Sequence, residues 1–515
     1  MTAVVYPTVV AMLRAAAAAA PEREALVDGS RRLSYRDYLA CVAGFARELS
    51  ALGVRGERVA YVLPNGLDIC IATFAIHAAG AQAVPLNPLY TERELAQILE
   101  DAAPRVLIHD AAGAALAETL AARLGIAARI AVGPGAKPLD QWRGGDGALP
   151  EPGPSPDDLG LLQYTGGTTG RSKGVNISHG ATARNIAQRE GLLPTGRGGE
   201  RIVCVMPLFH SYALAMGLHL AAYCSGTLVI LPRYKPDQLL ATMVEEKITI
   251  FPGSPTIFTG LLSRPDFAGA EFRRVHTCYS GSAVLPAEIL QRWEKTTGCP
   301  IYEGYGQTEA GPVLTYNPVH GVRKPGSVGI VLADTEVEIV DTEAGTRVLP
   351  PGEIGEIRAR GPQIMRGYRN LPAETAAALR DGWLYTGDLG EFDRDGYLYI
   401  RDRKKDMVIV GGYNVYPREV EEVLHMHPAV AEAAAVGVAD SYRGEVVHAY
   451  VVARPGRTLD DESLRAHCAA NLAKYKIPAV FRIVDALPKT TVGKLDKKTL
   501  RTIANEDAAR RAKTA

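Results

Sequence analysis

The sequence predicts an α/β protein. A large N-terminal domain of helix-covered sheets with a small β region is followed by a small α+β C-terminal domain. Three observations predict this class. Short β-rich runs alternate with helical patterns through the first two thirds of the chain, alternating strands follow from Glu336 to Arg360, and a compact α+β pattern follows Arg403. A chain of 515 residues also exceeds the size of one hydrophobic core, so at least two domains are expected.

The N-terminal part is predicted to consist of strands followed by helices. Capping spacings mark two helix starts, at Ser34 with Asp37 and at Thr91 with Glu94. The apolar run from Ala15 to Ala20 is predicted as helix and not as a signal peptide, because no basic segment precedes it. Parallel sheets covered by helices follow from strands predicted at residues 59–63, 81–86, 105–109, 203–206, 227–231 and 275–279.

The C-terminal part changes character after Arg403. Helices are predicted at residues 417–425 and 460–472, and strands at 431–438, 446–453 and 481–484. This unit of about a hundred residues is within the usual range for a domain. We place the boundary near Asp402 to Lys405, which gives domains of residues 1–402 and 403–515.

Composition restricts the classes of function. Lys plus Arg equals Asp plus Glu, so no net charge attracts the whole molecule to nucleic acid or to an anionic membrane. The seven cysteines are scattered without a C-x-x-C pair, which argues against a disulfide framework or a structural zinc site and favours a reducing cytoplasm. No apolar stretch is long enough to span a membrane, so any membrane contact is expected to be peripheral. Whether the chain is a monomer or a homodimer stays open.

The segment from Tyr164 to Val175 carries the strongest chemical signal. It contains four glycines, three threonines and a lysine behind the apolar run from Leu159 to Leu162. Glycines let backbone N–H groups approach phosphate oxygens, threonine hydroxyls donate further hydrogen bonds, and Lys173 adds charge. The spacing is not that of a G-x-x-x-x-G-K-[ST] loop, and an isolated run of this kind would more often be a surface turn. The candidate phosphate-binding residues are Thr165, Gly166, Gly167, Thr168, Thr169, Gly170 and Lys173.

Further motifs follow this segment in a fixed order. Together they resemble the adenylate-forming superfamily, which includes acyl-CoA synthetases, luciferases and the adenylation domains of peptide synthetases. The resemblance covers nearly the whole chain and implies an acid:CoA ligase that uses ATP, Mg²⁺ and coenzyme A with a carboxylic acid as substrate. The motifs span residues 207–213, 280–283, 305–310, 326–329, 383–388, 402–406, 411–417 and 488–494.

The resemblance implies roles for the residues of the adenylation reaction. Lys494 matches the lysine that bridges the reacting carboxylate and the α-phosphate. Thr308 matches a threonine that contacts the α-phosphate, and Glu309 matches the glutamate that holds Mg²⁺. His210 matches an aromatic residue or histidine that closes the acyl pocket, where gating is favoured over proton transfer. Without the resemblance, a lone histidine would be interpreted as a packed or solvated residue, and an isolated Gly-Lys as part of a solvated basic surface.

The nucleotide site is implied by a second group of residues. Asp388 matches the aspartate that accepts both ribose hydroxyls, and Arg403 matches its basic partner. The ring of Tyr305 offers a face for the adenine. The remaining candidates on this side are Gly281, Ser282, Ala283 and Gly306.

The second half-reaction is implied to need a rotation of the C-terminal domain. Lys405 matches the hinge residue of that rotation. The loop from Gly411 to Pro417 would then be presented to the thiol, with Gly412 lining the pantetheine tunnel and Gly411 and Tyr413 beside it.

The acid itself is the least determined feature of the sequence. Several candidate walls of the acyl pocket are small or apolar, which favours a medium- to long-chain fatty acid. Tyr212 and the pair Pro312-Val313 resemble 4-coumarate:CoA ligases instead, which leaves an aryl acid as the alternative. A pseudoenzyme that binds acyl-adenylate, an adenylation domain that loads a carrier protein and an oxygenase of the luciferase type share these motifs. The candidate walls are Tyr212, Ala213, Met216, Pro312 and Val313, with Gly281 and Gly306.

Overall fold

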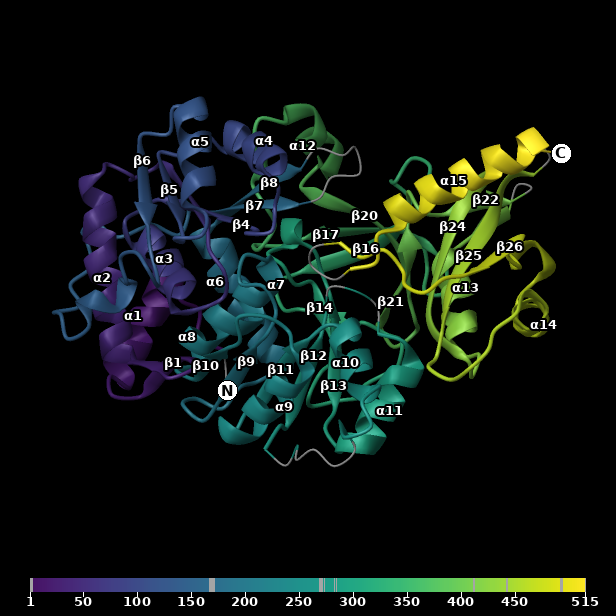
Figure 1. Ribbon diagram of the computed structural model, residues 1–515, viewed down its shortest axis with the longest axis horizontal. Coiled ribbons are helices and arrows are strands. Elements are labelled where there is room, and N and C mark those ends of the chain that lie inside the picture. Colours follow the sequence, from purple (N-terminus) through teal and green to yellow (C-terminus); the bar gives the residue numbers. More distant parts are fainter. Residues whose placement is uncertain are drawn as a thin grey trace.

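The computed structural model contains four β-sheets, the first three in the larger N-terminal part and the fourth near the C-terminus (Figure 1). It describes residues 3–165, 172–267, 272, 274–281, 283, 285–410, 413–440, 443–490 and 494–514, with side chains described up to residue 507.

A seven-stranded sheet forms one part of the N-terminal region. Its order is β18-β8-β7-β4-β3-β5-β6, and its central pairs are parallel, whereas β7 with β8 and β8 with β18 are antiparallel. The strands are β3 (Arg58–Val62), β4 (Gln82–Leu86), β5 (Val106–His109), β6 (Ala128–Ala131), β7 (Leu159–Thr165), β8 (Lys173–Ser178) and β18 (Gly367–Tyr368).

Helices cover both faces of this sheet because side chains alternate along its strands. Val59 and Tyr61 belong to the core that includes α2 (Tyr35–Ala51) and α3 (Leu67–Ala78). Ala60, between them, belongs to a separate core with α4 (Glu92–Ala102) and α5 (Ala114–Leu124). The predicted caps are present, since Ser34 accepts from the N–H of Asp37 and Thr91 forms a reciprocal capping box with Glu94.

A nine-stranded sheet forms the second part. Its order is β15-β14-β13-β12-β11-β9-β10-β1-β2, with parallel pairs in the middle and antiparallel pairs at both edges. The predicted parallel strands are confirmed with bounds that shift by one or two residues, and antiparallel edge strands extend both sheets beyond the prediction. The strands are β1 (Glu24–Asp28), β2 (Arg31–Ser34), β9 (Arg201–Cys204), β10 (Thr227–Ile230), β11 (Ile250–Gly253), β12 (Thr277–Ser280), β13 (Ile301–Tyr305), β14 (Thr315–Tyr316) and β15 (Ile330–Val331).

The helices of this part include the predicted Ala-rich helix. It is α1 (Val9–Ala19), whose N-terminal N–H groups are capped by Thr8. A π-helix, η2 (Leu214–His219), follows the short α7 (Ser211–Ala213) and continues into α8 (Leu220–Cys224). The other helices are α6 (His179–Leu192), α9 (Pro236–Glu245), α10 (Pro255–Leu262) and α11 (Ala287–Thr297).

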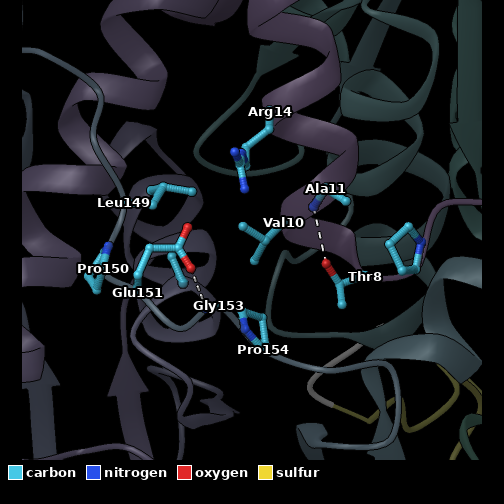
Figure 2. A pocket seen from close by; sticks show the side chains of 11 residues that line it. Thr8, Val10, Ala11, Arg14, Leu149, Pro150, Glu151, Gly153 and Pro154 are labelled. Atoms are coloured by element: carbon cyan, nitrogen blue, oxygen red, sulfur yellow. Dashed lines mark hydrogen bonds between the residues drawn. The ribbon is translucent and has the colours of Figure 1, made fainter.

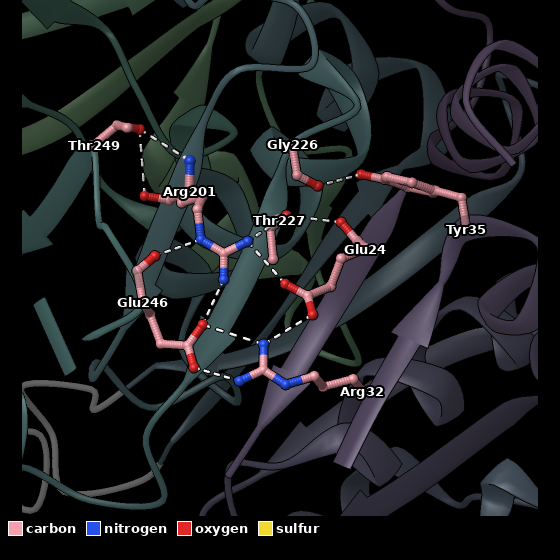
Figure 3. A network of polar contacts seen from close by, with 8 residues as sticks. All are labelled: Glu24, Arg32, Tyr35, Arg201, Gly226, Thr227, Glu246 and Thr249. Carbon is pink, nitrogen blue, oxygen red and sulfur yellow. Dashed lines mark hydrogen bonds and ion pairs between the residues drawn. The ribbon is translucent and has the colours of Figure 1, made fainter. Parts of the chain in front are cut away.

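A network of two arginines and two glutamates joins the strands at one edge of the nine-stranded sheet (Figure 3). Arg201 on β9 contacts Glu24 on β1 at 2.8 Å. Arg32 on β2 contacts Glu24 at 2.8 Å and Glu246, at the end of α9, at 2.5 Å. Two of these charge-assisted contacts join segments that are 177 and 214 residues apart in sequence, which a local pattern does not predict.

The small β region is a third sheet. Its strands are β16 (Glu336–Val340), β17 (Gly355–Arg360), β19 (Leu379–Arg380), β20 (Trp383–Phe392) and β21 (Leu398–Arg403), all antiparallel, and α12 (Pro372–Ala378) precedes β19. The alternating strands predicted between Glu336 and Arg360 are confirmed as β16 and β17.

The C-terminal part forms the fourth sheet with an apolar core of its own. The predicted boundary between Asp402 and Lys405 lies at the end of β21 and in the first residues of its connection to β22. Its elements are β22 (Val408–Val410), β23 (Tyr413–Val415), α13 (Pro417–His425), β24 (Val430–Asp440), β25 (Gly444–Ala453), α14 (Asp461–Asn471), β26 (Val480–Ile483) and α15 (Lys497–Thr514).

All seven cysteines are buried as free thiols, as the scattered spacing predicts. Among the described residues, no helix combines the length and the apolar character needed to cross a membrane.

Candidate active site

The residues predicted to bind the ribose meet at the junction of the second and third sheets. Asp388 on β20 is directly opposite Arg403 on β21 in the antiparallel register. The Arg403 Nε lies 3.0 Å from one oxygen of Asp388, and the hydroxyl of Tyr305, at the end of β13, donates to the other at 2.7 Å. Because the Asp388 side chain is 7% exposed and both its oxygens are held, this carboxylate is oriented before any ligand arrives.

Thr308 and Glu309 lie three and four residues beyond Tyr305, in the 3₁₀-helix η4 (Thr308–Ala310). The buried hydroxyl of Thr308 shares a hydrogen bond of 3.2 Å with that of Ser211, at the start of α7. The hydroxyl of Tyr368, on β18, donates to Glu309 at 2.9 Å. Sequence reasoning singled out Thr308 and Glu309. It gave Ser211 no role, although this residue lies in the motif at residues 207–213, and it missed Tyr368, which lies outside the motifs.

Tyr368 also connects Glu309 with the predicted phosphate segment. The ammonium of Lys173 lies 4.9 Å from the centre of the Tyr368 ring, within the range of a cation–π contact. Lys173 begins β8 and pairs across the ladder with Thr165, the last residue of β7. The predicted phosphate segment therefore connects two antiparallel strands, and its ends are fixed beside Glu309.

Lys494, from the C-terminal part, is brought to these residues of the N-terminal part. Burial lowers the pKa of Lys494 to about 8, with the charge of Arg403 acting in the same direction and Asp388 and Glu309 in the opposite one. Its backbone N–H donates to the Thr490 hydroxyl at 3.1 Å. Two cations, Lys494 and Arg403, and two acidic side chains, Asp388 and Glu309, therefore lie within electrostatic reach of one another.

His210 lies within electrostatic reach of Lys494. Its Nδ1 accepts from the backbone N–H of Tyr212 at 3.2 Å, so the proton of the neutral ring is on Nε2. Burial lowers the pKa of His210 to about 3, and the charge of Lys494 acts in the same direction. A histidine that stays neutral at pH 7 suits positioning or gating better than general base catalysis.

The predicted walls of the acyl pocket lie close together and are tightly packed. Tyr212, Ala213, Met216 and Val313 are buried. A Cβ at Gly281 would be 2.6 Å from the Tyr212 ring, and one at Gly306 would be 1.9 Å from the carbonyl oxygen of Pro312, so neither glycine tolerates a side chain here.

A small cavity of about 10 Å³ lies beside these walls. Of the predicted walls, Pro312 lines it, together with residues that the sequence did not indicate, including Ser211, Leu214 and His219. A larger cavity of about 170 Å³ lies between α1 and residues 149–154, with Arg14 and Glu151 in its lining (Figure 2). That cavity contains none of the predicted site residues, so it lies apart from the candidate active site.

The remaining predicted residues fall in two groups. Ala283 is exposed, Tyr413 begins β23 with its ring stacked at 4.8 Å on that of Tyr475, and Lys405 is exposed in the turn between β21 and β22. The other candidates lie outside the described residues; they are Gly166, Gly167, Thr168, Thr169, Gly170, Ser282, Gly411 and Gly412.

Known proteins share both parts of this chain. Residues 13–369 match the AMP-binding enzyme family, and residues 419–494 match the AMP-binding enzyme C-terminal domain. A long-chain-fatty-acid–CoA ligase of Bacillus subtilis is 37% identical over 96% of this chain and 94% of its own length. A feruloyl-CoA synthase of Amycolatopsis is also 37% identical, over 93% of this chain and 96% of its own length.

Solved structures agree with the sequence relatives. The anthranilate CoA ligase AuaEII in complex with anthranoyl-AMP superposes with a TM-score of 0.91 at 28% identity, over 98% of this chain and 99% of that one. ATP-bound MatB from Rhodopseudomonas palustris superposes with a TM-score of 0.87 at 33% identity, over 94% and 96%. ATP and coenzyme A are substrates of enzymes of this family. The chain therefore belongs to the AMP-binding enzymes of the adenylate-forming superfamily, as an ATP-dependent, AMP-forming acyl-CoA synthetase.

Proposed function

We propose that the chain activates a medium- to long-chain fatty acid, first as the acyl-adenylate and then as the acyl-CoA thioester. The observation that carries the proposal is the convergence of Lys494, Arg403, Asp388 and Glu309 from both parts of the chain. This set combines a lysine for the reacting phosphate, an Arg–Asp pair for the ribose and a second carboxylate for a metal ion. A pseudoenzyme would not need the partly buried lysine.

In the first step a carboxylate oxygen of the acid forms a bond to the α-phosphorus of ATP while the bond to pyrophosphate breaks. Two anions must approach each other, so cations at the reacting centre lower the barrier. Lys494 is proposed to contact the carboxylate and the α-phosphate, with Thr308 donating a hydrogen bond to the same phosphate. Lys173 and the segment after Thr165 are proposed to bind the leaving pyrophosphate.

The nucleotide is proposed to be held by the junction of the second and third sheets. The Asp388 carboxylate accepts from the ribose hydroxyls, and Arg403 holds it in place. Adenine is proposed to lie against Tyr305, beside Gly281 and Ala283. Glu309 fits Mg²⁺, because a carboxylate beside a phosphate site is a hard ligand and this ion takes its other oxygens from phosphates and water. When bound, Mg²⁺ would neutralise charge on the phosphates.

In the second step the thiol sulfur of coenzyme A attacks the acyl carbonyl carbon, and AMP leaves. Lys494 has no role in this step, and its position near Arg403 would hinder access. We propose that the C-terminal part turns at Lys405, which withdraws Lys494 and presents the segment around Gly412 and Tyr413 to the thiol arm. The exposed position of Lys405 between two sheets supports a pivot there.

The alternative acid is an aryl acid with a ring hydroxyl, and one observation favours it. The buried hydroxyl of Tyr212 has no hydrogen bond of ordinary geometry among the described residues, although the Tyr316 hydroxyl is close enough to influence its pKa. A phenolic substrate would satisfy this group. The relatives include both a fatty acid ligase and a feruloyl-CoA synthase, so they do not decide between the two acids.

The test is a screen of pyrophosphate release over saturated fatty acids of increasing length, hydroxycinnamates and benzoates, with and without coenzyme A. Fatty acids are expected to give the highest kcat/KM, with AMP and acyl-CoA formed in equal amounts when coenzyme A is present. Turnover of hydroxycinnamates alone would replace the fatty acid by the aryl acid. Acyl-adenylate that is never converted by coenzyme A would point to a carrier protein as the acceptor.

A further inference from the structure

The small cavity beside the acyl walls is apolar on one side and ends at polar groups. Leu161 on β7 and Ile177 on β8 form its apolar side, and Leu214 in η2 adds to it. Ser211 and Pro312 line it where it meets the reaction centre, because Ser211 bonds to Thr308. His219, at the other end of η2, also lines it.

His219 is a buried polar side chain without a partner. It is 2% exposed, and neither ring nitrogen has a hydrogen-bond partner in the described part of the chain. A buried group left in this state costs about 1 to 3 kcal/mol, and native proteins rarely keep one unless water or a ligand satisfies it. The ring of Phe74 contacts that of His219 edge-on at 5.9 Å, which helps to fix its plane.

The surroundings of His219 define the chemistry of its missing partner. His77 and His179 lie beside it, with their rings 4.9 Å apart, and each has an Nδ1 without a partner among the described residues. Burial lowers the pKa of all three histidines, to about 4 for His179 and His219, so they are neutral at pH 7. A carboxylate is not the expected partner, because no cation in this cluster would offset its charge. A metal ion is not expected either, because the described ranges contain no group of three side chains that could hold one.

A neutral imidazole offers one N–H donor and one acceptor nitrogen. A hydroxyl group matches this pair, since it donates one hydrogen bond and accepts others. The cavity volume of about 10 Å³ is on the scale of one water molecule, so a group of this size fits without further opening at that end. The π-helical turn that carries His219 is a rare local distortion, of a kind that often occurs at functional sites.

We propose that His219 forms the distal end of the acyl pocket and exchanges hydrogen bonds with a hydroxyl group on the far part of the acyl chain. The inference rests on the proposed function and narrows its substrate class to hydroxylated fatty acids. In their absence, water occupies the position of the hydroxyl.

The test compares kcat/KM for fatty acids of medium and long chain, each paired with its ω-hydroxy counterpart, using the full-length enzyme. At one chain length the hydroxylated acid is expected to be preferred by about five- to a hundredfold. His219→Leu should abolish this preference while turnover of the unsubstituted acid is kept or raised. His219→Gln keeps a donor and an acceptor and should retain part of the preference.

His77→Leu is the matched control, since it removes a buried histidine of the same cluster that does not line the cavity. It should leave the preference intact, and His219→Met provides a second apolar variant if His219→Leu does not fold. The inference alone would be overturned if unsubstituted fatty acids are turned over well and no preference for the hydroxylated acid appears at any chain length. It would also be overturned if both His219→Leu and His219→Met retain the preference. Failure of every fatty acid with the unaltered enzyme would instead overturn the proposed function, and this inference with it.

Discussion

Lys494 is the residue whose role has the clearest kinetic signature. Its ammonium is proposed to offset charge during adenylation and to be absent from thioester formation. Lys494→Ala should therefore lower the rate of pyrophosphate release by a factor on the order of a hundred to a thousand. The same variant, supplied with synthetic acyl-adenylate and coenzyme A, should form the thioester at the normal rate, which rapid-quench assays can measure. Normal adenylation by this variant would show that the assignment is wrong.

The lowered pKa of Lys494 also predicts a pH dependence. The amine carries its proton below about pH 8 and loses it as the pH rises through that value, since burial and Arg403 favour the neutral form. Only the protonated form offsets phosphate charge, so kcat/KM for ATP should fall above about pH 8. The residual activity of Lys494→Ala should lack this alkaline limb. A flat profile for the unaltered enzyme up to pH 10 would contradict the expectation.

Tyr212 distinguishes the two candidate acids at the level of one hydroxyl group. If the buried Tyr212 hydroxyl pairs with a phenolic substrate, Tyr212→Phe should raise the activation free energy derived from kcat/KM by roughly 1–3 kcal/mol. An unbranched fatty acid has no group to pair there, so the same variant should leave its kcat/KM unchanged. Both substrates are measured in parallel with the pyrophosphate assay. A large penalty for hydroxycinnamates, in an enzyme that prefers them, would favour the aryl acid.

The secondary structure elements show which parts of the fold a sequence determines locally. The helix at residues 417–425 has the predicted bounds, because Pro417 starts it and an apolar period of 3.6 sustains it. Thr91 and Glu94 likewise mark the start of α4 by their own chemistry. The antiparallel edge strand β18 was not predicted, because two residues carry no periodicity and their partner on β8 is nearly two hundred residues away.

The residues of the candidate site likewise divide into those that the sequence indicates and those that only the structure reveals. Motif residues such as Asp388, Arg403 and Thr308 were found by their resemblance to a family, and the structure brings them together. Tyr368 and His219 were missed, because their significance lies in contacts with Glu309 and with a cavity, and neither contact leaves a pattern in the neighbouring sequence. The π-helical turn of η2 is also invisible in the sequence, since its apolar residues would suit an ordinary α-helix equally well.

At the scale of the molecule, an ion pair joins the C-terminal part to the N-terminal part. Arg454, which follows β25, contacts both carboxylate oxygens of Glu288 on α11 at 2.9 Å. The two side chains are 28% and 41% exposed, so the pair is worth at most about 1 kcal/mol. Arg454→Gln should slow adenylation by up to about fivefold, because it weakens the arrangement that brings Lys494 to the site. Single-turnover assays would measure this rate at low and high salt, where the difference should shrink.

The control for that prediction is an ion pair of similar exposure within the C-terminal part. Lys476 contacts Glu419 there at 2.6 Å, with side chains 20% and 40% exposed. Lys476→Gln should leave the adenylation rate unchanged. Equal slowing by both variants would indicate a general loss of stability of the C-terminal part.

The ladder between β20 and β21 has a mechanical consequence. Arg403 is opposite Asp388 in that ladder, and Lys405, the proposed pivot, is two residues further along the chain. A rotating body displaces its points in proportion to their distance from the axis, so Arg403 is on a short lever arm, and more distant points of the C-terminal part sweep longer arcs. The proposed rotation would then move those distant points far, while Arg403, proposed to act on the ribose side, stays nearly still. In this proposal the enzyme replaces the residues used for adenylation by those used for thioester formation while the acyl-adenylate stays bound.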